Sequence, residues 1–358
     1  MMQMNKRMTT IQVATGHGED SIILEGIVRK LENGTLFLSW TGGGTYEPSQ
    51  KNRTMYSRSF DGGKTWEPER ILFQHPKKGI FTPALFVDGN RLFAFPGSYY
   101  DDTNFAQDMQ SYWSVSEDGG GRFSVPCSFP GCINNIHIKC TKKIGNRWLF
   151  ACSWIELDGN GWAPPGGDKA SIVAGNENVE WNGTIWEWNG QNHTEYCGVL
   201  MSEDEGKSWR ICGRIGHTGR RFVEPMLEEL SDGTLVMLLR TDEPWLWISR
   251  STDGGEHWSE SERTEIPSAV TKVCLLRGND GAIYLLHNPN PKGRNPLELW
   301  ISRDDMNTWQ EKHTLLSGED EKECFCYPDG FLDEERKMLC FAWENRKAVY
   351  YSEFSLEE

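Results

Sequence analysis

The apolar residues of this chain fall in short runs between polar turn residues. Two examples are the runs from Thr234 to Arg240 and from Ala348 to Phe354, which are typical of β-strands with at least one buried face. No long segment has the 3.6-residue period of an amphipathic helix, and 37 glycines and 16 prolines supply many positions for turns. The pattern predicts an all-β protein.

A hairpin unit recurs along the chain, in which an apolar strand, a tight turn and a second apolar strand follow one another. A turn residue such as Asp or Asn followed by Gly allows the positive φ that a short hairpin needs. Six such turns occur: Asn33 to Thr35, Asp88 to Asn90, Ile144 to Asn146, Asp232 to Thr234, Asp280 to Ala282 and Asp333 to Arg336. Six hairpins indicate a repeat architecture.

A second motif, Ser-x-Asp-x-Gly-x-x-Trp, follows most of these hairpins. Its five copies are Ser59 to Trp66, Ser116 to Phe123, Ser202 to Trp209, Ser251 to Trp258 and Ser302 to Trp309, where Met306 replaces the glycine. The last hairpin lacks this box, and the N-terminal run from Thr9 to Ala14 is free to supply its missing outer strand. We therefore predict a single six-bladed β-propeller of four-stranded antiparallel blades over 1–358, closed by its two ends.

Composition removes several classes of function. The formal net charge is −15 and is spread along the chain, which argues against nucleic acid as a partner. No 18-residue apolar run occurs, and the first eight residues are not followed by an apolar signal segment, so we expect a cytoplasmic protein without a membrane partner. Ten cysteines without zinc spacing predict no disulfide scaffold and no metal site, and no organic cofactor is expected.

In a four-stranded meander, the innermost strands all begin at the end opposite to the tight turns and the boxes. Residues from different blades therefore converge there. Counting back from the turns places Glu25, His137, Glu224, Lys272 and Tyr327 in this ring, and counting forward adds Arg240 and Glu344. The long loops lie at the same end, including an insertion at about 157–194 whose tryptophans suit either sugar stacking or packing of the loop. Convergent polar groups predict a binding or active site.

The boxes are Asp-boxes, and over nearly its whole length the chain resembles the sialidase (neuraminidase) superfamily of six-bladed propellers. Glu224 and Arg240 lie in a segment similar to the sialidase one in which a Glu begins the inner strand and an Arg ends the next. The segment around Arg294 is similar to that of a second substrate-binding arginine. Tyr327 falls in a segment that resembles that of the tyrosine nucleophile, and Glu344 falls where the family has a Glu that supports an arginine.

The chain departs from this pattern in its first blade. Sialidases open with a segment whose Arg completes a triad around the substrate carboxylate, whereas the matching stretch here is Leu24-Glu25-Gly26. A missing bidentate donor removes charge-assisted hydrogen bonds of roughly 1.5–3 kcal/mol each. The acid/base Asp that the family carries on the first long loop is also absent, and Glu47 is the nearest carboxyl.

These residues predict a sialidase-like exo-glycosidase that acts on a carbohydrate with a terminal, acidic or neutral, sugar. Tyr327 would be the nucleophile with Glu224 as its base, and Glu47 is a further catalytic candidate, although the sequence does not identify the general acid. For a sugar with a plain anomeric carbon, Glu25, Glu47 and Glu224 could instead supply the usual pair of carboxylates. Arg240, Arg294, Glu25, Lys272 and Glu344 would contact the substrate or one another. The alternatives are an oligosaccharide lyase acting on a uronate, with Tyr327 or His137 as base, and a non-catalytic propeller that binds glycan or protein.

Two further candidates on this face have simpler interpretations. His137 serves either as an acid or base, or as a hydrogen-bonding group of the channel wall. Asp101, on the loop from Gly97 to Met109, either contacts substrate or caps the loop. Oligomeric state is not encoded in any pattern that we find.

Overall fold

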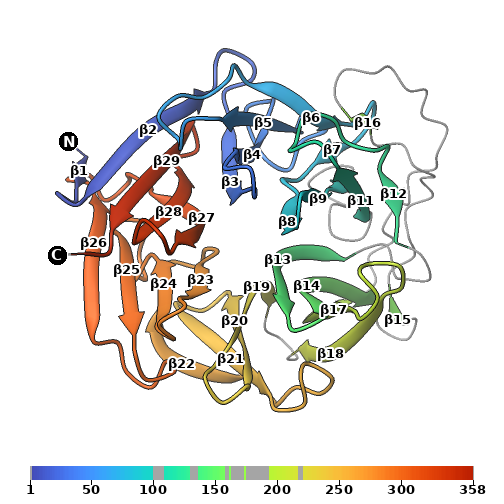
Figure 1. Ribbon diagram of the computed structural model, residues 1–358, viewed down its shortest axis with the longest axis vertical. Helices are drawn as coiled ribbons and strands as arrows, with labels where there is room; N and C mark the ends of the chain where they lie inside the picture. Colours follow the sequence, from blue (N-terminus) through green and yellow to red (C-terminus); the bar gives the residue numbers. More distant parts are fainter. Residues whose placement is uncertain are drawn as a thin grey trace.

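The computed structural model describes residues 2–99, 109–129, 136–157, 161–162, 173–174, 193–216 and 221–357. Within these residues all regular structure is β-strand, and six sheets stand like blades around a central axis (Figure 1). The described part therefore has no helix that could cross a membrane. The prediction of an all-β, six-bladed propeller of four-stranded antiparallel blades is confirmed.

Each blade is a meander whose first strand lies nearest the axis. The six blades, in the order inner to outer strand, are β3 (Ile23–Lys30), β4 (Leu36–Gly42), β5 (Arg53–Ser59) and β6 (Arg70–Gln74); β8 (Ala84–Asp88), β9 (Arg91–Phe95), β11 (Gln110–Ser116) and β12 (Cys127–Ser128); β13 (His137–Ile144), β14 (Arg147–Leu157), β17 (His193–Ser202) and β18 (Arg210–Gly216); β19 (Phe222–Glu229), β20 (Leu235–Thr241), β21 (Trp245–Ser251) and β22 (Glu262–Pro267); β23 (Cys274–Arg277), β24 (Ile283–His287), β25 (Leu297–Ser302) and β26 (Glu311–Ser317); and β27 (Cys326–Asp333), β28 (Met338–Glu344), β29 (Ala348–Ser355) and β2 (Met8–Thr15).

Five short strands extend these blades. They are β1 (Gln3–Met4), which pairs with β26, β7 (Gly79–Ile80) and β10 (Gly97–Tyr99) in the second blade, β15 (Gly161–Trp162) beside β14, and β16 (Val173–Ala174) beside β6.

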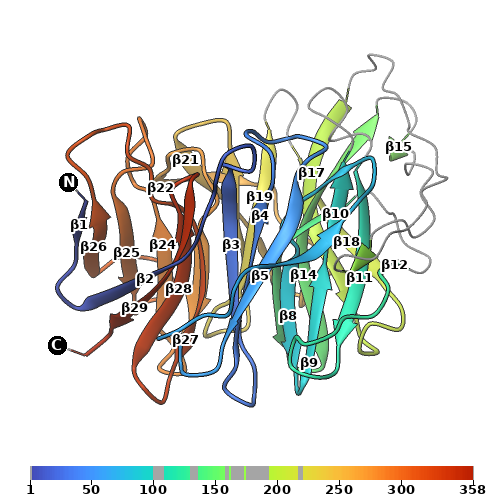
Figure 2. The same cartoon turned by 90° about the horizontal axis from the view of Figure 1, so that it is seen from above.

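The ring is closed by pairing of the two ends of the chain. Strand β2 runs antiparallel to β29, from Met8 opposite Phe354 to Thr15 opposite Ala348. The N-terminal run thus supplies the outer strand of the last blade, as its sequence predicts (Figures 1 and 2). This pairing covers an edge that an open array of blades would expose.

The Asp-boxes form the turns between third and fourth strands. In the first box, Ser59 Oγ donates to Asp61 Oδ1 at 2.9 Å and accepts from the N–H of Gly63 at 2.8 Å. The fifth box keeps this pattern, because Met306 adopts a φ of 67° in place of the glycine and its N–H donates to Ser302 Oγ at 2.9 Å. The boxes are therefore structural turns.

Large apolar side chains fill the space between neighbouring blades. Trp40, Trp148 and Trp343 have almost no exposed surface, and each belongs to a separate cluster of buried residues. Burial of this kind contributes roughly 25 cal/mol per Å² of apolar surface. The blades are thus held face to face, and their inner ends form a rigid frame around the axis.

Candidate active site

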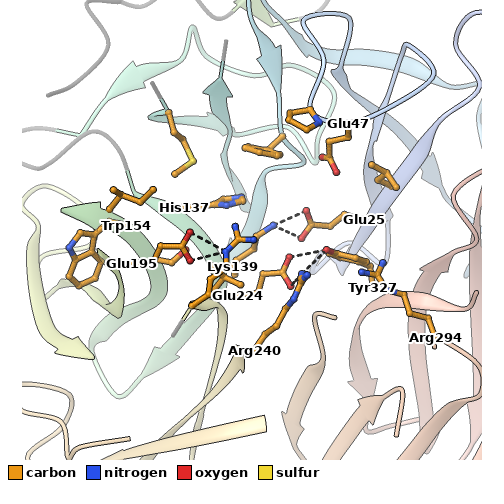
Figure 3. Close-up of a pocket in the computed structure, with 18 of the residues that line it drawn as sticks. Glu25, Glu47, His137, Lys139, Trp154, Glu195, Glu224, Arg240, Arg294 and Tyr327 are labelled. Carbon is orange, nitrogen blue, oxygen red and sulfur yellow. Dashed lines mark hydrogen bonds and ion pairs between the residues drawn. The ribbon is translucent and has the colours of Figure 1, made fainter. Parts of the chain in front are cut away.

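A cavity of about 260 Å³ opens at the end of the propeller where the innermost strands begin (Figure 3). Residues from the starts of β3, β13, β19 and β27 line it, together with loop residues that follow β4, β24 and β28. None of its lining residues belongs to an Asp-box. Among the described residues, its charged lining consists of four carboxylates, Glu25, Glu47, Glu195 and Glu224, and five cations, Lys139, Arg221, Arg240, Arg294 and Arg346.

Three of the lining residues share an unusual backbone conformation. Glu25, Glu224 and Tyr327 have φ values of 52°, 50° and 53°, and each lies where the strand register shifts at a β-bulge. A left-handed conformation costs a residue other than glycine about 1–3 kcal/mol, and bulges commonly redirect a side chain. The same local device in three blades therefore brings these three side chains to the cavity.

Tyr327 forms a closed network with a carboxylate and a guanidinium. Its hydroxyl donates to Glu224 Oε1 at 3.1 Å and accepts from Arg240 Nη1 at 2.9 Å. The same nitrogen donates to Glu224 Oε2 at 2.6 Å. The tyrosine oxygen thus lies beside a group that can take its proton and a cation that can stabilise its charge (Figure 3).

The protonation states of this network follow from burial and charge. Burial opposes ionisation of Glu224, but the charges of Arg240 and Lys139 outweigh it and lower the pKa to about 2. Burial and the nearby Glu224 charge raise the pKa of Tyr327 well above its usual value. At neutral pH the network therefore holds an ionised Glu224 and a neutral tyrosine.

Glu25 is neutralised by two lysines. Lys139 Nζ lies 2.7 and 2.8 Å from its two carboxylate oxygens, and the fully buried Lys272 approaches one of them at 3.3 Å. Lys272 also lies 3.8 Å from Asp329. The first blade therefore presents an ion pair to the cavity at the position where the sialidase resemblance implies an arginine.

Glu47 lies on the loop between β4 and β5 and lines the cavity. Burial, followed by the charge of Glu25, raises its pKa to about 7, although Lys139 acts in the opposite direction. A carboxyl group with this pKa is largely protonated in slightly acidic solution and can donate a proton near neutrality.

Arg294 and Arg346 line the cavity without a carboxylate partner among the described residues. The guanidinium of Arg294 lies 5.2 Å from the centre of the Tyr327 ring, and its Nη1 is 3.6 Å from Cys326 Sγ. Arg346 belongs to the turn between β28 and β29, and its hydrogen bonds are made by its backbone. The other three cations of the cavity are each paired with a glutamate.

Two predicted site residues lie behind the cavity wall. Lys272 is buried between Glu25 and Asp329, and its charge also helps to lower the pKa of Glu224. Glu344 has no exposed surface; it accepts from Cys326 Sγ at 3.2 Å and from the N–H of Arg346. No guanidinium among the described residues hydrogen-bonds to it, in contrast to the role implied by the resemblance, and burial raises its pKa to about 8.

The remaining candidates divide between the cavity wall and the part of the chain outside the described residues. His137 lines the cavity and stacks on Phe81 with ring centres 4.8 Å apart, and burial lowers its pKa well below the usual value, so the ring is neutral. Its Nε2 is buried and lacks a hydrogen-bond partner among the described residues. Asp101 and most of the insertion at about 157–194 lie outside the described residues.

Several lining residues are not found by counting along the sequence. Lys139 lies two residues after His137 in a strand, where a lysine usually faces solvent. Arg346 follows Glu344 by two residues, in a turn. Arg221, directly before β19, pairs with Glu195 of β17 in the preceding blade at 2.8 Å. Counting two residues further along this strand from His137 would have added Lys139 to the predicted ring of inner-strand residues. In the described part, no group of three or more metal-ligating side chains occurs.

Solved structures with the same fold cover nearly the whole chain. A Hadza microbial sialidase superposes with a TM-score of 0.73 at 16% identity, covering 95% of this chain and 66% of that one. A protein of unknown function from Dyadobacter fermentans superposes with a TM-score of 0.71 at 16% identity, covering 98% of this chain and all of that one. Similarity at this level establishes the fold.

Curated relatives are similar over most of this chain but are longer. A sialidase of Trypanosoma cruzi is 24% identical over 85% of the chain, and a sialidase of Bacteroides fragilis is 22% identical over 74%. The matched regions span 27% and 49% of those relatives' own lengths. The profile of the BNR repeat-like domain family matches residues 34–340. The chain therefore belongs to the BNR repeat-like domain family, whose sialidase relatives share its six-bladed propeller.

Proposed function

We propose that the protein is a sialidase-like exo-glycosidase that releases a terminal acidic sugar. The observation that carries the proposal is the network in which the Tyr327 hydroxyl contacts both Glu224 and Arg240. A tyrosine nucleophile suits an anomeric carbon that bears a carboxylate, because a carboxylate nucleophile would be repelled. The similarity to named sialidases supports the same class of reaction.

In the first step, Tyr327 Oη would attack the anomeric carbon while its proton passes to Glu224. Because the pKa of Glu224 is low and that of Tyr327 is high, the proton moves only as the new C–O bond forms and the tyrosine oxygen becomes acidic. Arg240 lies 2.9 Å from that oxygen and stabilises its developing charge. Glu47 gives its proton to the glycosidic oxygen as that bond breaks, so the aglycone leaves as a neutral alcohol.

In the second step, water would attack the anomeric carbon of the glycosyl-tyrosine intermediate. The Glu47 carboxylate takes a proton from this water, and the tyrosine oxygen recovers its proton from Glu224 as it leaves. Both glutamates thus return to their initial protonation states. The pKa of about 7 for Glu47 suits this exchange of roles, since both forms are accessible near neutral pH.

Charge in and around the cavity favours an acidic sugar. The protein as a whole carries a formal charge of −15, yet the described lining of the cavity has five cations against four carboxylates, one of which has a pKa of about 7. A local positive excess on an acidic protein attracts an anionic ligand to this place. The tyrosine and the cation excess thus favour the same substrate class.

The test is turnover of purified protein on aryl glycosides of N-acetylneuraminic acid, uronic acids and neutral hexoses, for wild type and Tyr327→Phe. We expect aglycone release from an acidic glycoside and a loss of roughly 10³-fold or more in kcat for the variant. Tyr56→Phe is the control, because Tyr56 packs on Phe37 in the first blade away from the cavity.

Other outcomes favour the other functions. Formation of an unsaturated uronate without simple hydrolysis would instead indicate a lyase. Saturable binding of glycans without turnover of any of them would indicate a binding propeller. Full activity of Tyr327→Phe would refute the assignment of the nucleophile.

A further inference from the structure

The cavity holds two guanidinium groups that have no ion-paired carboxylate within the described part of the chain. Lys139, Arg221 and Arg240 are ion-paired with Glu25, Glu195 and Glu224 at 2.7, 2.8 and 2.6 Å. The remaining carboxyl, Glu47, lines the same cavity and is influenced by the charge of Arg346, but it forms an ion pair with neither Arg294 nor Arg346. We infer that Arg294 and Arg346 together bind the anionic group of the substrate, and that Arg346 is a specificity-determining residue.

The backbone of Arg346 is fixed although the residue is exposed. Its N–H donates to the buried Glu344 carboxyl group, and its carbonyl accepts from the N–H of Ile23 at 3.1 Å. Its φ of 68° is in the left-handed region, in which a residue other than glycine requires support from its surroundings. The turn is thus anchored to both the last and the first blade, so the side chain starts from a defined point on the cavity rim.

Two observations place Arg346 and Arg294 on the same side of the cavity. Both line it, and both are linked to the same buried pair of side chains. Arg294 Nη1 lies 3.6 Å from Cys326 Sγ, which donates to the Glu344 carboxyl group that accepts from the N–H of Arg346. Arg294 also stacks over the Tyr327 ring. The anionic group would therefore lie beside the nucleophile, where it orients the anomeric carbon.

The chemistry of the pair points to a carboxylate on the sugar. Guanidinium groups bind carboxylates through paired, charge-assisted hydrogen bonds, and two of them that are not ion-paired to a described carboxylate can receive one from a ligand. Glu344 has a supporting part, because it holds the Arg346 backbone from behind the wall. This inference rests on the proposed function for the identity of the ligand as an acidic sugar.

Binding measured without turnover tests the inference. Calorimetric titration in a Tyr327→Phe background would use N-acetylneuraminic acid and galacturonic acid, each beside its methyl ester. Arg346→Ala should weaken binding of the better acid by about 10- to 100-fold and leave its ester unchanged. Arg346→Lys should recover part of the loss, since a lysine keeps the charge without the paired geometry.

Lys347→Ala is the matched control, because it removes the same charge from the next residue of the turn, which does not line the cavity. It should bind the acid as the parent protein does. Equal losses for acid and ester in Arg346→Ala, unchanged binding of the acid, or no saturable binding of either acid by the parent protein would each overturn the inference. Arg346-dependent binding without turnover of any glycoside would refute the proposed hydrolase and leave this anion site standing.

Discussion

Replacement of Glu47 by glutamine tests whether the cavity tunes this carboxyl group as a general acid. With a pKa of about 7, roughly 90% of the group is protonated at pH 6, whereas a carboxyl at the ordinary value of 4.5 would be protonated in only about 3% of molecules. The environment of Glu47 thus increases the acid form about 30-fold at this pH. Glutamine has a similar shape but cannot donate the proton.

The expected loss depends on the leaving group. For a sugar alcohol, which departs poorly as an anion, Glu47→Gln should lower kcat/KM by about 10²- to 10⁴-fold. For an aryl aglycone such as 4-methylumbelliferone, which departs as a stable anion, the loss should be roughly tenfold or less. Glu265→Gln, an exposed position of β22, is the control and should change neither value.

The pH profile gives a second readout of the same change. Glu224, with a pKa of about 2, stays ionised over the accessible range, so wild-type kcat/KM should show one basic limb near pH 7 where Glu47 loses its proton. The limb should vanish in Glu47→Gln. A limb that persists in the variant, or an equal loss for both kinds of leaving group, would refute the assignment of Glu47 as the acid.

Two further variants test buried charges that support the site. The pKa of Glu344 is about 8, so the folded protein keeps a proton that the unfolded chain releases above about pH 4.5. The free energy of unfolding should therefore fall as pH rises from there to 8, by about 5 kcal/mol at most. Glu344→Gln should flatten this fall in urea unfolding between pH 5 and 8.5, and parallel curves for the two proteins would contradict the prediction. Lys272→Met should lower the free energy of unfolding by about 3 kcal/mol, because it leaves Glu25 and Asp329 with one cation fewer. Adding Glu25→Gln to this variant should restore part of the lost stability. A double variant no more stable than the single one would show that Lys272 acts through packing.

The propeller could be predicted because its signals are local. The Asp-Gly turns and the serine and aspartate of each box act within a few residues of chain, and Met306 shows that the turn tolerates loss of its glycine when the remaining hydrogen bonds stay. The closing strand was predictable by counting, since the chain has six hairpins but five boxes and the last blade therefore lacked an outer strand, which the N-terminal run supplies.

The site was predictable only in outline. Counting from the turns found Glu25, Glu224 and Tyr327, because the inner strands converge, but the spacing could not reveal the bulges that direct these side chains. Lys272 was counted into the ring, yet its side chain turns behind the wall toward Asp329. Arg346 was missed because an arginine in a polar turn carries no sequence signal of the cavity that it faces.

The joint between the first and last blades lies beside the reactive centre. Arg29 and Lys30 of β3 form ion pairs with Asp329 and Asp333 of β27, and β2 pairs with β29 in the same blade. Glu25 precedes Arg29 on β3, and Tyr327 precedes Asp329 on β27.

Residues more than 300 positions apart must therefore meet before Tyr327, the proposed nucleophile, faces a complete cavity wall. Completion of the site would be among the last events of folding, after the interior blades have packed. A nascent or damaged chain with an open joint would keep most of its apolar core but would be inactive. Activity thus reports on the integrity of the whole ring, not of one blade.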